Sequence, residues 1–158
     1  MKTSEKLKNQ LMVFEGLRTS AYTDAAGVLT IGYGHTKGVK QGDKISPFWA
    51  QELLQMDIDD TEKEVKELGV ARTEGQLDAL VSFAFNVGIG RLKESTLLKV
   101  IREGSSKNQI KKEFKRWVYA GGKVQPGLVK RREWEAKRFF EPDEMEPMKV
   151  RDWSDFHK

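Results

Sequence analysis

The stretch that decides the fold is FEGLRTSAYTDAAGVLTIGYGHT, residues 14–36. It begins at the end of a helical pattern, passes through a turn that Asp24 opens, and continues into strand-forming residues that include Thr30. Glycines interrupt this run repeatedly, which is typical of short strands joined by tight turns. The stretch therefore predicts a change from helix to β-hairpins near residue 16.

Three candidate catalytic side chains lie within 16 residues in this stretch: the carboxylates of Glu15 and Asp24 and the hydroxyl of Thr30. Ser4 is the predicted N-cap of a short helix. Glu15 is predicted in the last turn of that helix, where the helix dipole disfavours a negative charge. A residue that opposes its local preference is a candidate for function. An acid and a second carboxylate in a different environment are the groups that hydrolysis of a glycosidic bond uses.

A long helix is predicted after the β-containing segment. Ser46-Pro47 combines an N-cap residue with a proline at the first helical position. Helical spacing continues to about residue 68, and the residues expected on the apolar side are Trp49, Leu53, Met56, Val65 and Leu68. Such a helix is suited to join two parts of a domain.

The chain is therefore expected to have an α+β fold with two lobes. A small N-terminal lobe of short antiparallel β-hairpins is joined by the long helix to a larger, all-helical C-terminal lobe. The expected boundaries are about 16–45 for the small lobe, 46–68 for the linking helix, 73–140 for the helical lobe, 1–140 for the single domain, and 141–158 for an acidic tail with prolines.

Composition excludes several classes of protein. The 158 residues include no cysteine, so disulfides and thiol chemistry are excluded. With only two histidines as well, no metal site and no cofactor are expected. We find neither the pattern of a signal peptide nor a run long enough for a membrane span, so no membrane anchor is expected.

Charge is distributed unevenly along the chain. Residues 91–138 carry a net charge of +10, whereas residues 52–67 carry −5. The basic part could offer a face to an anionic partner such as nucleic acid, anionic lipid or bacterial cell wall. The alternative is that it forms an ordinary solvated helical surface.

In this order and spacing, the residues resemble the phage-type lysozymes, glycoside hydrolase family 24. The resemblance begins with Glu15-Gly16, the nine-residue step to Asp24, and TIGYGHT at 30–36. It covers about residues 5–140 and is closer to endolysins of lambdoid-like phages than to those of T-even phages. It continues with SFAFNVG at 82–88, STLL at 95–98, RWVYAGG at 116–122 and GLVKRR at 127–132.

The resemblance implies a role for each candidate catalytic residue. Glu15 matches the general acid, while Asp24 and Thr30 match the residues that hold the attacking water, which corresponds to an inverting reaction. Arg131 is the better match to the arginine that the family pairs with the acid, and Arg132 is the alternative.

Other residues are assigned binding or supporting roles. Asn86 matches an amide that binds saccharide, unless it only ends a helix. Gly32 could allow a sugar to approach closely, although tight packing of the hairpin explains it equally well. His35 is expected to be structural rather than a catalytic base, with its ring bonded to a neighbour.

The activity that the resemblance implies is that of an endolysin. Such a muramidase hydrolyses the β-1,4 bonds between N-acetylmuramic acid and N-acetylglucosamine in peptidoglycan and thereby lyses the host cell wall. We expect a monomer that stays in the host cytoplasm until a holin opens the membrane, with no stable membrane association.

Three other functions compete with this interpretation. A lytic transglycosylase would cut the same bond without water, but it would not need Asp24 and Thr30 at this spacing. A non-catalytic peptidoglycan-binding module would not need Glu15 either. Nucleic-acid binding lacks a supporting motif in residues 91–138 and is not expected.

Overall fold

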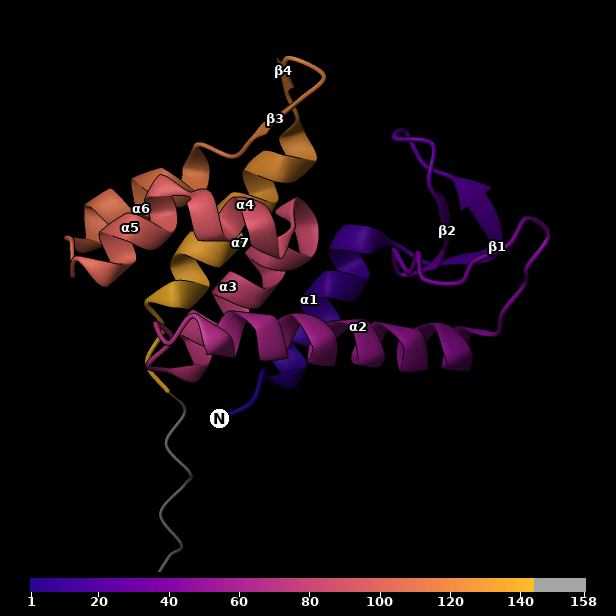
Figure 1. Cartoon of the computed structure of the whole chain (residues 1–158), viewed down its shortest axis with the longest axis horizontal. Coiled ribbons are helices and arrows are strands. Elements are labelled where there is room, and N and C mark those ends of the chain that lie inside the picture. Colours follow the sequence, from indigo (N-terminus) through magenta and orange to yellow (C-terminus); the bar gives the residue numbers. More distant parts are fainter. Residues whose placement is uncertain (144–158) are drawn as a thin grey trace, which may run out of the picture.

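The computed structural model describes residues 1–143 and shows two lobes joined along one side by a long helix (Figure 1). In chain order the elements are α1 (Glu5–Glu15), β1 (Arg18–Thr23), β2 (Leu29–Gly32), α2 (Pro47–Glu67), α3 (Glu74–Val87), α4 (Ile89–Glu94), α5 (Thr96–Arg102), α6 (Lys107–Lys115), β3 (Tyr119–Ala120), β4 (Lys123–Val124) and α7 (Pro126–Phe139).

The predicted α+β class is confirmed. Helix α2 runs from the β1–β2 region to the helical lobe, and α1 enters between the two lobes (Figure 1). Both helices begin as their sequences predict, because Ser4 and Ser46 each accept a backbone N–H bond as N-caps.

One detail of the prediction is wrong: the region 73–140 is not entirely helical. Strands β3 and β4 form a short antiparallel hairpin within it. Its tip is Gly121-Gly122, both of which have positive φ, at 60° and 75°. Two such residues suit a two-residue hairpin turn, and this pair could have been read from the sequence as a turn rather than a helix break.

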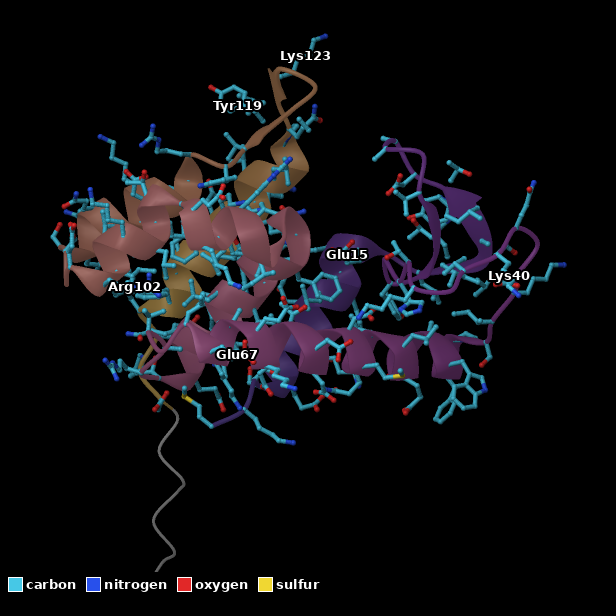
Figure 2. All side chains as sticks on the ribbon, in the orientation of Figure 1. Glu15, Lys40, Glu67, Arg102, Tyr119 and Lys123 are labelled. Atoms are coloured by element: carbon cyan, nitrogen blue, oxygen red, sulfur yellow. The ribbon has the colours of Figure 1, made fainter. Side chains whose placement is uncertain are left out.

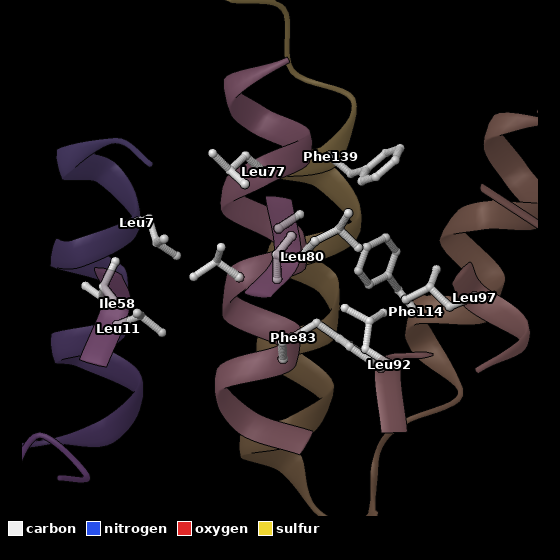
Figure 3. Packing of buried hydrophobic residues seen from close by; sticks show 14 of the residues in the cluster. Leu7, Leu11, Ile58, Leu77, Leu80, Phe83, Leu92, Leu97, Phe114 and Phe139 are labelled. Atoms are coloured by element: carbon white, nitrogen blue, oxygen red, sulfur yellow. The ribbon is translucent and has the colours of Figure 1, made fainter. Parts of the chain in front are cut away.

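The hydrophobic core lies mainly in the helical lobe. Leu80 and Phe83 of α3 are fully buried there, and the ring of Phe83 meets that of Phe114 edge to face, with centroids 5.9 Å apart (Figure 3). Leu7 and Leu11 extend this core to α1. The end of α1 is thereby held firmly against the helical lobe.

The predicted apolar side of α2 is displaced around the helix. Trp49 and Met56 are 60% and 59% exposed, whereas Ala50, Leu54 and Ile58 are buried. Both sets follow a spacing of three to four residues, so helical periodicity alone does not distinguish them. The sequence correctly predicted the helix and the burial of Val65, but not the side that faces the core in the first half of the helix.

Part of the positive charge of the basic region 91–138 lies inside the protein. Arg131, Arg132 and Arg138 are 4%, 0% and 3% exposed and each contacts at least one carboxylate. These three charges contribute to the interior and cannot meet an anionic partner.

The structure also bears on the ends of the domain. No helix among residues 1–143 is both long enough and apolar enough to cross a membrane. Glu141 accepts a bond from Lys6, and Asp143 accepts one from the backbone of Glu74. The remainder of the predicted 141–158 tail lies outside the described residues.

Candidate active site

The candidate site is built on the contact between α3 and α7. Glycine at position 75 lets the two helices approach closely, because a Cβ there would lie 2.4 Å from the carbonyl oxygen of Arg138. Residues 131, 135 and 138 recur at helical spacing on α7 and contact carboxylates or hydroxyls of neighbouring elements. The polar face of α7 is therefore turned inward.

Glu15 lies at the C-terminal end of α1, where Gly16 ends the helix with a φ of 69°. Figure 2 shows it between the helical lobe and the β-containing lobe. Its side chain is 22% exposed, and its Oε1 accepts a bond of 2.8 Å from Nη1 of Arg131. Within residues 1–143, its Oε2 has no hydrogen-bond partner and faces Gly34, where a Cβ would lie 3.0 Å away.

The guanidinium of Arg131 is held on several sides. Its Nη2 donates to the carbonyl oxygen of Ser82 over 2.9 Å, and its centre lies 5.1 Å from the ring centroid of Phe14. Its Nε lies 3.5 Å from Oε2 of Glu135. Arg131, and not Arg132, is thus the arginine that contacts Glu15.

Arg132 serves a different set of groups. It donates to Glu135, to Oδ1 of Asn86, and through Nε to the carbonyl oxygen of Trp117 over 3.0 Å. Its guanidinium also lies over the ring of Phe83. Burial lowers the pKa of Arg132, and the nearby Glu135 opposes that change.

Glu135 is fully buried beneath these two arginines. Ser82 donates its hydroxyl to Oε2 of Glu135 over 2.6 Å. Burial raises the pKa of Glu135, while Arg132, Arg131 and Ser82 stabilise its ionised form and oppose the rise. This carboxylate connects the arginine that contacts Glu15 to the one that contacts Asn86.

Two hollows adjoin the contact between Glu15 and Gly34. The larger, of about 650 Å³, is lined by Glu15, Asn86 and Arg131 together with Lys130 and other residues of α1 and α7. The smaller, of about 240 Å³, lies between the two lobes, and Gly34 is part of its lining. A polymer that spans the junction of the lobes would pass Glu15.

Asp24 and Thr30 lie in the small lobe, and neither lines the larger hollow. Oδ1 of Asp24 accepts bonds of 2.9 Å from the backbone of Ala26 and of Val28, as expected for an Asp that opens a turn. Thr30 is 4% exposed, and its hydroxyl donates to the carbonyl oxygen of Val28. Both side chains are thus held to the backbone of Val28 in the β1–β2 turn.

His35 and Gly32 lie at packed positions of the small lobe. The ring of His35 contacts Asp57 and the carbonyl oxygen of Lys37, each at 2.8 Å. A Cβ at Gly32 would lie 3.2 Å from Ile45 and 3.4 Å from the Cβ of Ala50, so this glycine packs against the start of α2. Residues 1–143 contain no group of three or more residues placed to hold a metal ion.

Sequence reasoning missed two polar residues of this site, Ser82 and Glu135. The helix around Glu135 was interpreted as a basic surface helix. The spacing of Arg131, Arg132 and Glu135, with the carboxylate four and three residues after the arginines, is a signal that could have indicated an internal cluster.

A two-lobed α+β fold with a partly buried carboxylate where the lobes meet defines a lysozyme-like protein. The family model for phage lysozyme matches residues 12–135, and the chain belongs to this family. The resemblance that the sequence showed is therefore confirmed.

Individual proteins agree with this assignment. The chain is 45% identical over 143 residues to an endolysin of Bacillus phage B103. The aligned region covers 88% of this chain and 54% of that protein. The chain is also 38% identical to an endolysin of Acyrthosiphon pisum secondary endosymbiont phage 1. That aligned region covers 88% of this chain and 98% of the endolysin. The chain spans about half the length of the Bacillus phage relatives it matches.

A solved structure shows the same fold. The muramidase domain of SpmX from Asticaccaulis excentricus superimposes with a TM-score of 0.81 and 32% sequence identity. The match covers 89% of this chain and 99% of that one. The lysozyme-like arrangement therefore extends over nearly all of the described residues.

Proposed function

We propose that this protein is a muramidase of the endolysin type. It would hydrolyse the β-1,4 bonds between N-acetylmuramic acid and N-acetylglucosamine in bacterial peptidoglycan. The observation that carries the proposal is the position of Glu15, where the two lobes meet, with one carboxyl oxygen held by Arg131 and the other free. Membership of the phage lysozyme family supports the same activity.

Glu15 would act as the general acid. Cleavage requires a proton on the leaving oxygen, and a carboxyl group must offer that proton in a fixed direction. Because Arg131 holds Oε1, the proton would reside on Oε2, beside Gly34. Glycine at that position leaves room for the acid to face the smaller hollow between the lobes.

Asp24 and Thr30 would position the attacking water on the opposite side of the sugar. The Oδ1 atom of Asp24 is engaged by the turn, which leaves its Oδ2 to accept a proton from water. The reaction would be inverting, so that water enters as the bond breaks. Asn86 would bind saccharide from the larger hollow, which it lines.

The biological setting follows from the same proposal. The substrate is peptidoglycan, reached from the host cytoplasm once a holin has opened the membrane, and the enzyme acts as a monomer. The relatives described as endolysins support peptidoglycan as the substrate.

The test is mass spectrometry of products from purified peptidoglycan, with the Glu15→Gln variant beside the unaltered chain. Products with reducing-end N-acetylmuramic acid, absent with the variant, are expected. Anhydro ends would instead mean a lytic transglycosylase and would remove the roles of Asp24 and Thr30. Binding without cleavage would mean a non-catalytic wall-binding module.

A further inference from the structure

Glu135 is the only carboxylate within residues 1–143 that contacts both arginines of the site. It lies 3.5 Å from Arg131 and is hydrogen-bonded to Arg132, and its side chain is fully buried. No sugar or water can reach it directly, so it takes no part in bond cleavage. Its contacts suggest that it acts through its neighbours.

The contact with Arg131 is electrostatic rather than a hydrogen bond. The Nε of Arg131 is buried and has no hydrogen-bond partner among the described residues, although Oε2 of Glu135 lies 3.5 Å away. An unpaired buried donor is costly unless a nearby charge compensates it. The carboxylate of Glu135 supplies that charge, while Ser82 fixes the direction of Oε2.

The charges of this cluster balance only if Glu135 is counted. Two guanidiniums, Arg131 and Arg132, are offset by two carboxylates, Glu15 and Glu135. Without Glu135, the buried positive charge would act on Glu15 alone and would favour its ionised form. A general acid must be protonated in order to work, so that change would oppose catalysis.

We propose that Glu135 is a positioning residue, which orients Arg131 toward Glu15 and offsets part of the positive charge of the two arginines. This inference rests on the proposed function. It adds a buried carboxylate that sets the pH range in which Glu15 can donate its proton.

Charged groups surround Glu135 and Glu15 on several elements, and those around the smaller hollow are Lys37, Asp57, Asp60 and Glu64. Glu135 faces Arg131 and Arg132 on its own helix, and α3 offers it only the hydroxyl of Ser82. Glu15 at the end of α1 faces Arg131, and Lys130 lines the same hollow. In the small lobe, Asp24 is held by its own turn and His35 is paired with Asp57.

The test compares two variants that separate charge from shape. Glu135→Gln keeps the shape and removes the charge, so the fall of activity at high pH should move to lower pH by roughly half a unit to one unit. Glu135→Asp keeps the charge but withdraws it by one methylene, and a smaller shift in the same direction is expected. The measurement is kcat and KM for peptidoglycan across pH, with KM nearly unchanged.

Asp78→Asn is the matched control. Asp78 is also fully buried between α3 and α7, but it contacts Arg138 and not Arg131. The Asp78→Asn variant should destabilise the protein without shifting the pH dependence of its activity. An unchanged profile in a folded Glu135 variant would overturn the proposal, and if Glu135→Gln does not fold, Glu135→Asp decides.

A second readout separates this inference from the proposed function. The ionisation of the Glu15 carboxyl can be followed by carbon NMR in the unaltered chain and in Glu135→Gln. Its midpoint should move to lower pH in the variant even if the unaltered chain releases no product. Absence of product would then refute the muramidase activity, whereas an unmoved midpoint would refute the role of Glu135.

Discussion

Two clusters of buried ionic groups join α3 and α7, and they differ in what they reach. We name the first the cavity cluster; it consists of Glu15, Ser82, Arg131, Arg132 and Glu135. We name the second the N-terminal cluster; it consists of Ser4, Glu74, Asp78, Arg138 and Glu141.

The charges of the two clusters are arranged differently. In the N-terminal cluster a single guanidinium, that of Arg138, meets three carboxylates. Burial lowers the pKa of Arg138, but the bond to Asp78 and the nearby acids outweigh this and raise it. In the cavity cluster, burial instead lowers the pKa of Arg132 and raises that of Glu135.

The comparison shows that a buried ion pair alone does not identify a catalytic site. Both clusters hold the same two helices together, and both end in a partly exposed carboxylate: Glu15 is 22% exposed and Glu74 is 40% exposed. Of the two, Glu15 lines the larger hollow and has its second carboxyl oxygen beside a glycine. Its position at the hollow, rather than burial of charge, distinguishes the site.

The largest expected effect separates these two exposed carboxylates. Glu15→Gln should lower muramidase activity at least about 100-fold, because it removes the proton donor and little else. Glu74→Gln likewise removes the charge of a partly exposed carboxylate, the one that contacts Arg138, and should leave activity unaltered. Lysis assays with both variants, at equal amounts of folded protein, measure the difference. Activity above a few per cent in Glu15→Gln would refute the assignment of the acid.

The next effect concerns stability. Asp78→Ala leaves the buried guanidinium of Arg138 without its main partner and should lower the free energy of unfolding by about 3 kcal/mol. Activity per folded molecule should remain, since Asp78 is remote from both hollows. Denaturant unfolding and a lysis assay provide the two measurements. A loss of activity without loss of stability would show that the two clusters act together.

A glycine offers a third, smaller test. Gly34→Ala adds a Cβ 3.0 Å from Oε2 of Glu15 at a φ of 78°, so it should cost about 1–2 kcal/mol and lower kcat several-fold. Gly38→Ala is the control, because its φ of 70° gives the same strain but no atom lies within 4 Å. Equal losses of kcat in the two variants would mean that contact with Glu15 is unimportant.

Much of this architecture was predictable from local sequence. The N-caps Ser4 and Ser46 and the turn at Asp24 depend on contacts within a few residues, and each was predicted correctly. The inner face of α2 and the burial of Arg131 and Glu135 depend on which helices pack together. These features require contacts such as that between Glu135 and Ser82, 53 residues apart, which periodicity does not encode.

The smallest effect tests where the N-terminal cluster ends. Ser4 caps α1 and also donates its hydroxyl to Asp78, whereas Ser46 caps α2 through the backbone of Trp49 alone. Ser46→Ala should therefore lower the free energy of unfolding by about 1 kcal/mol, the usual cost of a lost N-cap. Ser4→Ala should cost about 1 kcal/mol more, because the buried Asp78 also loses a donor. Denaturant unfolding of both variants measures this difference. Equal costs would mean that Arg138 and the backbone N–H of Ser4, which remains in the variant, satisfy Asp78 without the hydroxyl.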